Sequence, residues 1–234
     1  YFNAVFLIPM LPLAVLVGMG MHTTWLRMSG EPLRKRLLFP AGIALMIGII
    51  FPFILFGQAS ALTLVGVVTA LWVIASSLLE PAKRLFQKNR SPMPLTRGQW
   101  GMYLAHMGVG VFILGATVTS SYTIETDSRA VPGDRWQVGE YELYFRDIRR
   151  IEGVNYEATE GEFEVWEGDQ LVTILRPQKR VYRVQTSPMT EAAIDVGWGR
   201  DLFIALGDPL GDGAWSLRVQ IKPLIRFIWL GALI

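Results

Sequence analysis

A stretch of about twenty uncharged residues, Gln99–Ser120, constrains the fold of this chain more than any other segment. It is rich in Val, Leu, Ile and Gly, and its length matches the roughly 20 apolar residues that an α-helix needs to cross a bilayer. One ionisable side chain, His106, lies about a third of the way along it. An ionisable group within a membrane span costs roughly 2.5 kcal/mol or more, so His106 is a candidate functional residue. The segment is therefore predicted to be a transmembrane helix with a functional histidine.

Composition supports a membrane component and excludes several kinds of site. Charged residues make up 18% of the chain, whereas soluble domains carry about 25%. Residues 121–222 hold 18 acidic and 12 basic residues, and the remainder holds 2 acidic and 10 basic. This asymmetry indicates the positive-inside rule in a lipid bilayer and no nucleic-acid partner. Because cysteine is absent, disulfides, thiolate metal sites and covalent haem attachment through C-x-x-C-H are excluded.

Apolar runs predict four transmembrane helices within residues 1–120. They are expected at about 2–21, 37–56, 59–79 and 99–120. Basic loops at 23–36 and 80–98 are predicted on the cytoplasmic side, and the uncharged hairpin 57–58 on the opposite side. Residues 223–234 begin a fifth span. Both ends of the chain fall within apolar runs, so we expect an internal part of a longer polytopic protein.

Residues 121–222 have the pattern of a separate β domain outside the membrane. Short apolar runs alternate with turn signals such as those at 132–134, 160–161 and 207–209. Near-regular spacing of short strands is typical of a small sandwich or barrel. A hundred residues are enough for a core of their own. The acidic side chains are spread along strands and turns without an acid/base pair, which indicates a solvated surface.

His106 has two interpretations that the residue pattern leaves open. Gly110, one helical turn further on, would leave room for a flat macrocycle, and histidine is a common axial ligand of haem iron. Alternatively, the ring bonds across helices to a Ser, a Thr or a backbone carbonyl. His22, at the end of the first span, is interpreted as an interfacial residue. Lys222 and Arg226 are expected to reach the lipid headgroups or a haem propionate.

Four segments, taken in order, resemble the C-terminal part of one family, the CcmF/NrfE membrane haem lyases of bacterial cytochrome c maturation. They are WGMYLAHMGVGVFILGATVTSSY at 100–122, VYRVQTSPMTEAAI at 181–194, GWGRDLFIALGD at 197–208 and RVQIKPLIRFIWLGALI at 218–234. The order and spacing of these segments carry the resemblance, which covers essentially the whole chain.

The resemblance implies a function and a set of partners. The family joins haem, delivered by the chaperone CcmE, to the C-x-x-C-H thiols of apocytochrome c in the periplasm, with CcmH/CcmI-type subunits as further partners. It holds a structural haem b between two transmembrane histidines, and the later of these matches His106. The implied location is the bacterial inner membrane. The implied fold is a polytopic α-helical membrane protein with an inserted periplasmic all-β domain, a small barrel or sandwich.

The chain lacks other parts of the family pattern. These are the tryptophan-rich WWD segment, the two periplasmic histidines that ligate incoming haem, and the second transmembrane histidine, all expected upstream of Tyr1. This part alone is therefore not expected to catalyse ligation. The alternative function is a non-catalytic assembly protein whose β domain docks partners. A transporter or channel is disfavoured, because apart from the histidine the spans carry no intramembrane charge that could line a path.

Overall fold

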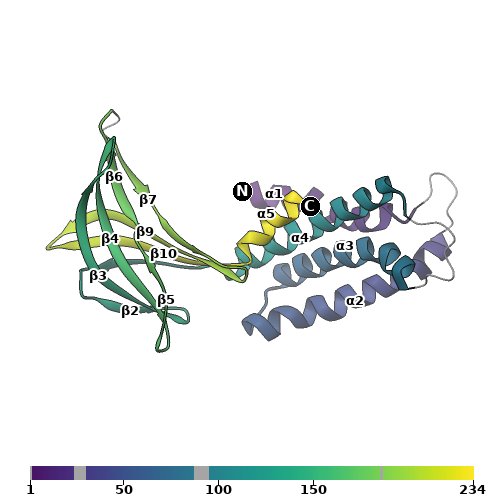
Figure 1. The fold of residues 1–234 in the computed structure, drawn as a ribbon. Helices are drawn as coiled ribbons and strands as arrows, with labels where there is room; N and C mark the ends of the chain where they lie inside the picture. The colour runs from purple at the N-terminus through teal and green to yellow at the C-terminus, as the bar shows by residue number, and fades with distance from the viewer. Residues whose placement is uncertain (1, 24–29, 87–94, 185–186) are drawn as a thin grey trace. The chain divides into compact units, whose positions relative to one another are not determined.

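The chain folds into two compact units, one helical and one built of β-strands (Figure 1). The computed structural model describes residues 2–23, 30–86, 95–184 and 187–234. The helical unit comprises the residues up to Ser121 together with Leu224–Ile234, and the β unit comprises Tyr122–Pro223. The β unit is thus inserted between two helices of the membrane part.

The helical unit contains five helices in its described residues. They are α1 (Phe2–Gly20), α2 (Gly30–Phe56), α3 (Ala61–Phe86), α4 (Arg97–Tyr122) and α5 (Ile225–Leu233). Within the described residues, three segments are long and apolar enough to cross a bilayer: Leu33–Phe56, Ala61–Leu85 and Arg97–Tyr122. The apolar segment of α1, Leu7–Gly20, is shorter.

Two helices extend into segments that the charge pattern assigns to loops. α2 begins at Gly30 rather than near Leu37, and α3 continues to Phe86 rather than ending near Leu79. Glu80 on α3 pairs with Arg36 on α2 at 3.1 Å and with Lys83 at 3.6 Å. Because these charges are paired across and along the helices, they do not end either helix. Residues 24–29 and 87–94 of the two predicted basic loops lie outside the described residues.

Local side-chain bonds set the helix ends. The hydroxyl of Ser60 accepts the backbone N–H of Thr63 at 3.1 Å and so caps the first turn of α3. Thr96 and Gln99 form a reciprocal capping box before α4: each side chain accepts the backbone N–H of the other residue, at 3.2 and 2.9 Å. Gly57 ends α2 with a positive φ of 71°, a conformation that favours glycine.

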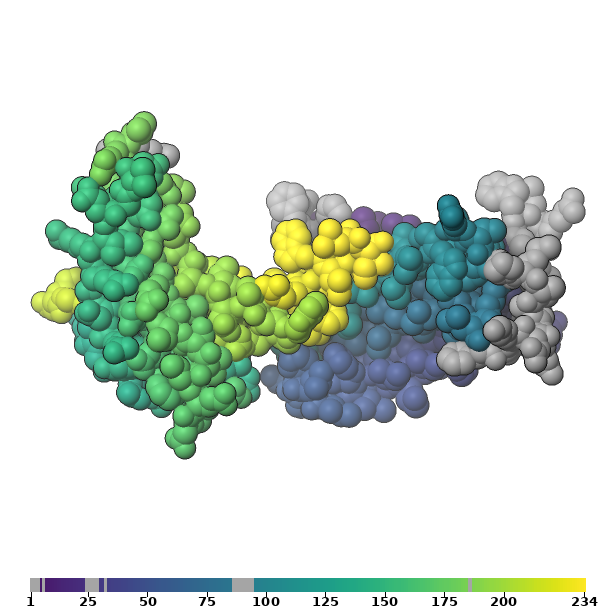
Figure 2. Space-filling view, in the orientation of Figure 1, coloured from purple at the N-terminus to yellow at the C-terminus, as the bar shows by residue number. Residues whose placement is uncertain are grey.

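Helix α4 packs closely on both α3 and α5 through glycines. A Cβ atom at Gly110 would lie 2.6 Å from Cγ1 of Ile74 on α3. On another face of α4, a Cβ atom at Gly108 would lie 2.6 Å from the carbonyl oxygen of Gly231 on α5, and α5 is visible against α4 in Figure 2. Small residues let helix backbones approach in this way within membranes, so the contacts fix the position of α4 between its two neighbours.

The β unit is a sandwich of two antiparallel sheets. Its strands are β1 (Ile124–Ala130), β2 (Arg135–Val138), β3 (Tyr141–Glu152), β4 (Tyr156–Glu167), β5 (Gln170–Leu175), β6 (Gln178–Tyr182), β7 (Pro188–Glu191), β8 (Ala193–Val196), β9 (Arg200–Gly211) and β10 (Ala214–Pro223). One sheet has the order β1-β10-β9-β8, and the other has the order β2-β3-β4-β6-β7 with β5 paired to β4. The predicted all-β domain is therefore confirmed, and of the two expected architectures it is the sandwich.

Alternating inward residues from both sheets form one core. Its centre is the stacked pair Phe145 and Phe163, whose ring centroids lie 4.4 Å apart and whose side chains are fully buried. The other sheet contributes Ile204 and Leu206 of β9 and Leu217 of β10, which are buried in the same core. The β unit thus builds this core from its own residues.

Two of the predicted turns lie inside strands. Gly161 belongs to β4, where a Cβ atom would lie 2.7 Å from the ring of Phe163. Gly207 belongs to β9, where a Cβ atom would lie 2.8 Å from the hydroxyl of Ser216 across an irregularity in the pairing with β10. Both glycines allow close contact within a sheet, a role that glycine can have in a strand as well as in a turn.

Candidate functional site

The ring of His106 is oriented by its own helix. Its Nδ1 atom lies 2.7 Å from the carbonyl oxygen of Met102, one turn earlier in α4. A carbonyl oxygen only accepts hydrogen bonds, so Nδ1 carries the proton. In the neutral ring Nε2 then holds a free lone pair, and the structure gives it no partner among the described residues. Histidines that bind metals typically donate their other ring N–H to a carbonyl or carboxylate in this manner.

Gly110 does not provide the space beside His106 that the sequence suggested. The gap left by its missing side chain is filled by Ile74 and by the carbonyl oxygen of Ala70, which a Cβ atom would approach to 3.0 Å. The physical reason is that the space beside a glycine on a membrane helix can be filled by a neighbouring helix as well as by a ligand. The expected role of Gly110 is therefore wrong, and its side of His106 faces α3.

The open side of His106 lies next to this contact. At about 100° per residue, Ala105 and Val109 flank His106 on the side turned away from Gly110, and both are exposed. His106 itself is half-buried, at the border between the face packed on α3 and the exposed face. Among the described residues, this exposed side of α4 is the side open to a flat ligand.

His22 lies just past the end of α1, as expected, but its side chain is buried against α3. Its side chain is 3% exposed, and Nε2 lies 2.9 Å from the carbonyl oxygen of Ser76 on α3. Because the carbonyl accepts, Nε2 is the protonated nitrogen and binds the end of α1 to α3. The signal in the sequence is Gly18 shortly before it, against which Trp72 of α3 packs. Close approach of α1 to α3 brings His22 inward.

The described residues suit a haem iron better than a bare metal ion. Among them, no group of three or more His, Cys, Asp or Glu side chains is placed to hold a metal. A porphyrin supplies four of the iron ligands itself and needs only axial ligands from the protein. One oriented imidazole with a free Nε2, in a half-buried position on a membrane helix, fits that need.

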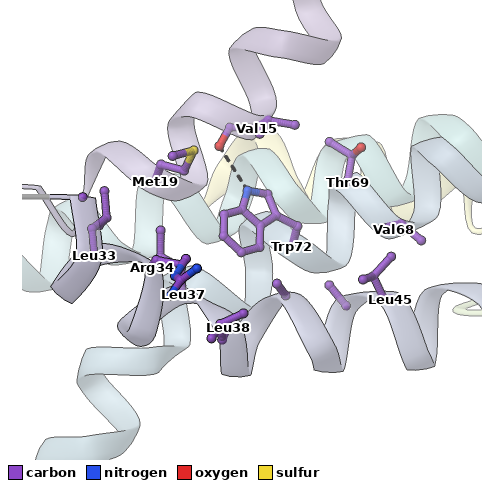
Figure 3. A pocket seen from close by; sticks show the side chains of 13 residues that line it. Val15, Met19, Leu33, Arg34, Leu37, Leu38, Leu45, Val68, Thr69 and Trp72 are labelled. Atoms are coloured by element: carbon purple, nitrogen blue, oxygen red, sulfur yellow. Dashed lines mark hydrogen bonds between the residues drawn. The ribbon is translucent and has the colours of Figure 1, made fainter.

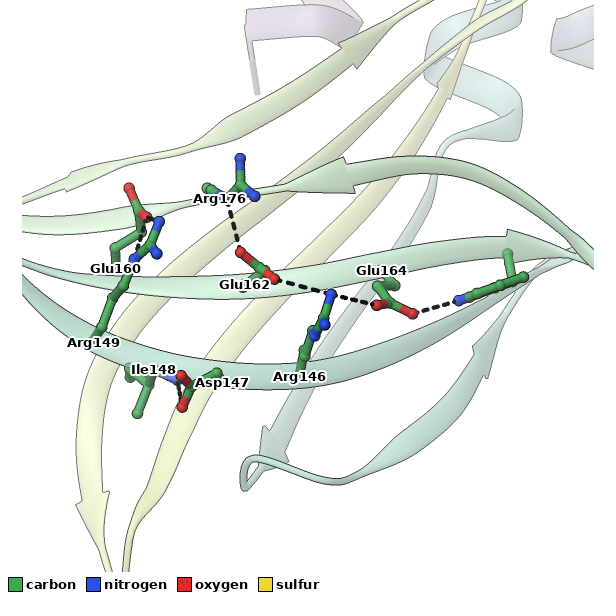
Figure 4. Close-up of polar contacts among 9 residues, drawn as sticks. Arg146, Asp147, Ile148, Arg149, Glu160, Glu162, Glu164 and Arg176 are labelled. Carbon is green, nitrogen blue, oxygen red and sulfur yellow. Dashed lines mark hydrogen bonds and ion pairs between the residues drawn. The ribbon is translucent and has the colours of Figure 1, made fainter.

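Several carboxylates on β4 form ion pairs with arginines of the same sheet (Figure 4). Arg146 bridges Glu162 at 3.5 Å and Glu164 at 3.1 Å, and Arg176 binds Glu162 at 2.9 Å. Glu160 is the most buried of these carboxylates, with a side chain 8% exposed and a 2.6 Å bond from Arg149. The figure shows the arginines and glutamates pointing toward one another along adjacent strands. The network holds neighbouring strands together.

The pKa of Glu160 is lowered by its partners. Burial raises it, but the hydrogen bonds from Arg149 and Gln178 and the charge of Arg149 lower it by more. Glu160 therefore stays ionised at neutral pH, as a structural ion pair requires.

One apolar strip is exposed at an edge of the sandwich. Ile194 and Val196 on β8 and Trp198 just after it point outward at alternate positions, and Trp198 is 77% exposed. β8 is the last strand of its sheet. We call these three residues the β8 strip. At the end of β10, Lys222 lies over the ring of Phe203, with its Nζ atom 5.2 Å from the ring centroid.

Residues 121–223 match a family model described as the CcmF C-terminal beta-sandwich. Over its full length the chain is 36% identical to the cytochrome c-type biogenesis protein CcmF of Pseudomonas fluorescens, of which it covers 36%. It is 34% identical over its full length to the CcmF of Escherichia coli strain K12, of which it covers 35%. The chain is also 35% identical to the cytochrome c-type biogenesis protein NrfE of Haemophilus influenzae, in an alignment that covers 58% of this chain and 21% of that protein.

A solved structure, that of the "Cytochrome c Heme Lyase CcmF", has the same fold. It aligns with a TM-score of 0.80 and 19% identity over 99% of this chain and 38% of that one. The chain thus spans about a third of the length of the curated relatives that it matches, 36% in the case of the Pseudomonas fluorescens protein. The sandwich, the apolar helices before it and the relatives along the whole chain agree: this is a membrane protein whose β unit matches the CcmF C-terminal beta-sandwich and whose full length is similar to the CcmF cytochrome c-type biogenesis proteins.

Proposed function

We propose that the chain is part of a membrane haem lyase for cytochrome c maturation. In this role it binds haem b in the membrane, with His106 as an axial ligand of the iron, and helps to present haem to apocytochrome c. The observation that carries the proposal is the 2.7 Å bond from Nδ1 of His106 to the Met102 carbonyl, which leaves Nε2 free to ligate.

Other residues of this chain fix the position of the His106 ring, which would ligate the haem iron. The Met102 carbonyl fixes the ring orientation and leaves Nε2 free to ligate. The glycine contacts of α4 with α3 and α5 keep the helix in place. When bound, the haem supplies one-electron chemistry at its iron. The chain contains no cysteine, so the thiols that become linked to haem come from the apocytochrome.

The location and partners follow from the same proposal. The basic residues around α2, α3 and the start of α4 support a cytoplasmic position for those helix ends, and α4 then leads outward to the β-sandwich. We place the protein in the bacterial inner membrane with its sandwich in the periplasm. There it would meet the haem chaperone CcmE, the apocytochrome and CcmH/CcmI-type subunits.

The test is haem retention in the full-length protein purified from membranes. His106→Ala is expected to lose the absorption spectrum of a b-type haem, because it removes the axial nitrogen. His22→Ala is the matched control: it removes the other histidine of the chain, whose Nε2 is committed to Ser76, and is expected to retain the haem. Equal haem content in wild type and His106→Ala, with both proteins folded, would overturn the assignment.

A second candidate function is a non-catalytic docking subunit of the same machinery. The β8 strip favours it, because exposed apolar residues on an edge strand can receive a partner. The two functions differ in one measurement. A protein that retains cytochrome precursors in a pull-down, loses them on Trp198→Ser, and never carries haem would be a docking subunit.

A further inference from the structure

A groove lies between α1 and α2, and α3 forms its floor (Figure 3). Its volume is about 560 Å³, and apolar side chains line nearly all of it. They include Met19 on α1, Leu37 and Leu45 on α2, and Val68 on α3. Both α1 and α2 pack mainly on α3, so the space between them stays open. We call it the Arg34 groove, after the charged residue in its lining.

The Trp72 indole in the floor of the groove is held in place, and its N–H is already used. The indole N–H of Trp72 donates to the carbonyl oxygen of Val15 at 3.1 Å, a bond drawn in Figure 3. The ring also packs against Gly18, where no side chain intervenes. A ligand in the groove therefore meets an apolar, well-positioned surface.

In the part of the chain that the structure describes, one cation without a carboxylate partner lies at the end of the groove. Of three consecutive basic residues on α2, Lys35 pairs with Glu31 at 2.8 Å and Arg36 pairs with Glu80 at 3.1 Å. Among the described residues Arg34 has no such carboxylate partner, and it is the one of the three that lines the groove. A guanidinium at the edge of a hydrocarbon layer is stabilised by an anion, and phosphate suits its geometry.

The length of the groove corresponds to one leaflet. From Arg34 to Leu45, α2 rises about 16 Å at about 1.5 Å per residue. Half of a hydrocarbon core of about 30 Å is about 15 Å. A chain that starts at the level of Arg34 and follows the groove would reach the middle of the bilayer.

We propose that the Arg34 groove binds an anionic phospholipid, with the phosphate on the Arg34 guanidinium and one acyl chain along the groove. The positive charge of Arg34 favours a phospholipid over an uncharged apolar surface as the occupant of the groove. An uncharged apolar surface laid over the groove would leave the guanidinium without a partner in a poorly hydrated place, whereas a lipid phosphate pairs with it. The site is independent of His106 and of the proposed function.

The proposal is tested by lipid retention in the full-length protein, measured by native mass spectrometry in mild detergent. Phosphatidylglycerol and phosphatidylcholine serve as the anionic and zwitterionic probes. Wild type is expected to retain phosphatidylglycerol preferentially, and Arg34→Gln to bind it about fivefold more weakly. Lys35→Gln is the matched control, because it makes the same change of charge one residue away on a side chain that does not line the groove. It is expected to change binding less than about twofold.

A second variant tests the apolar half of the site. Ala41→Trp fills the groove without a change of charge, so it is expected to reduce retention of the lipid as well. Equal losses in Arg34→Gln and Lys35→Gln would overturn the proposal, since they indicate diffuse attraction to a basic surface. Retention unaffected by both Arg34→Gln and Ala41→Trp, equal retention of the two lipids by wild type, or cross-linking of a protein segment into the groove would overturn it too.

Discussion

The two histidines show how a single hydrogen bond assigns a role to a residue. Both rings donate to a backbone carbonyl, but through different nitrogens: Nδ1 of His106 to Met102 and Nε2 of His22 to Ser76. The Nδ1 donor bonds within its own helix and leaves the outer nitrogen of the ring available. His22 donates through Nε2 to another helix and so links the end of α1 to α3. The same residue type is thus a candidate ligand in one place and a packing element in the other.

The glycines of α4 set the position of His106, and they can be tested one by one. Gly108→Val places a side chain where a Cβ atom would already lie 2.6 Å from the backbone oxygen of Gly231. Since backbone cannot give way as a flexible side chain does, we expect a loss of about 1–3 kcal/mol in stability. The measurement is thermal unfolding in detergent.

The control for this prediction lies on the same helix. A Cβ atom at Gly101 would meet nothing within 4 Å, so Gly101→Ala is expected to be neutral or to stabilise α4 by up to about 1 kcal/mol. A Gly108→Val variant as stable as Gly101→Ala would show that α4 and α5 do not pack as described.

At the residue scale, the sequence predicts which residues are unusual but not what they touch. His106 stands out because an ionisable group in an apolar span is rare, and that argument needs no neighbours. The role expected for Gly110 is wrong because it depends on what fills the space beside it, and α3 does. The burial of His22 likewise depends on the approach of α1 to α3, which hydropathy does not report.

Strand β4 connects most of its sheet, and its charged side chains are part of the reason. It pairs with β3, β5 and β6, and Glu160 accepts bonds from Arg149 on β3 at 2.6 Å and from Gln178 on β6 at 2.6 Å. The carboxylate thus joins three strands at one point.

Removal of this charge is expected to weaken the sheet. Glu160→Gln replaces a buried charge-assisted bond by a neutral one and leaves the Arg149 guanidinium without its carboxylate, at a cost of about 2 kcal/mol. Hydrogen exchange of the β4 and β6 amides in the whole protein measures it. Glu152→Gln is the control, because its carboxylate is 72% exposed and its pair with Arg183 contributes about 1 kcal/mol or less. Equal protection in both variants would contradict the role of Glu160.

The effect of Glu160 is expected to depend on pH. Its pKa is lower in the folded protein than in the unfolded chain, so its contribution to stability is present above the unfolded pKa, about 4.3. That contribution is lost as pH falls through the folded pKa. The difference in stability between wild type and Glu160→Gln should therefore be full at about pH 7 and shrink below about pH 4. A difference that is constant down to about pH 3 would show that the ion pair does not stabilise the fold.

At the scale of elements, periodicity predicts the strands well and their interruptions poorly. The alternation at Tyr141, Leu143 and Phe145 appears as inward residues of β3, because a strand with one buried face must alternate. The pairs Glu160–Gly161 and Gly207–Asp208 look like turns but lie in strands, because each glycine makes room for a group on another residue. Helix ends are also misplaced where charges pair between helices, as at Arg36 and Glu80.

For the whole molecule, the division into two units has a simple cause. The β unit is inserted between α4 and α5, and its first and last strands pair with each other, with Ile124 opposite Ile221. The two ends of the inserted segment therefore lie side by side within the β unit itself. An insertion of this kind leaves the helical unit continuous and makes the inserted domain self-contained.

The β unit is therefore expected to fold when it is produced alone as residues 122–223. All of its core residues belong to the unit, and its ends are already paired, so the cut removes no part of the core. A domain of this size should unfold cooperatively with a stability of at least about 5 kcal/mol, measured by urea denaturation followed by circular dichroism. Phe163→Ala removes half of the stacked pair at the centre and should cost about 3–5 kcal/mol, whereas Val184→Ala, at a fully exposed position, should change little. A gradual transition in the wild-type unit, or equal effects of the two variants, would mean that the sandwich depends on the membrane helices for its fold.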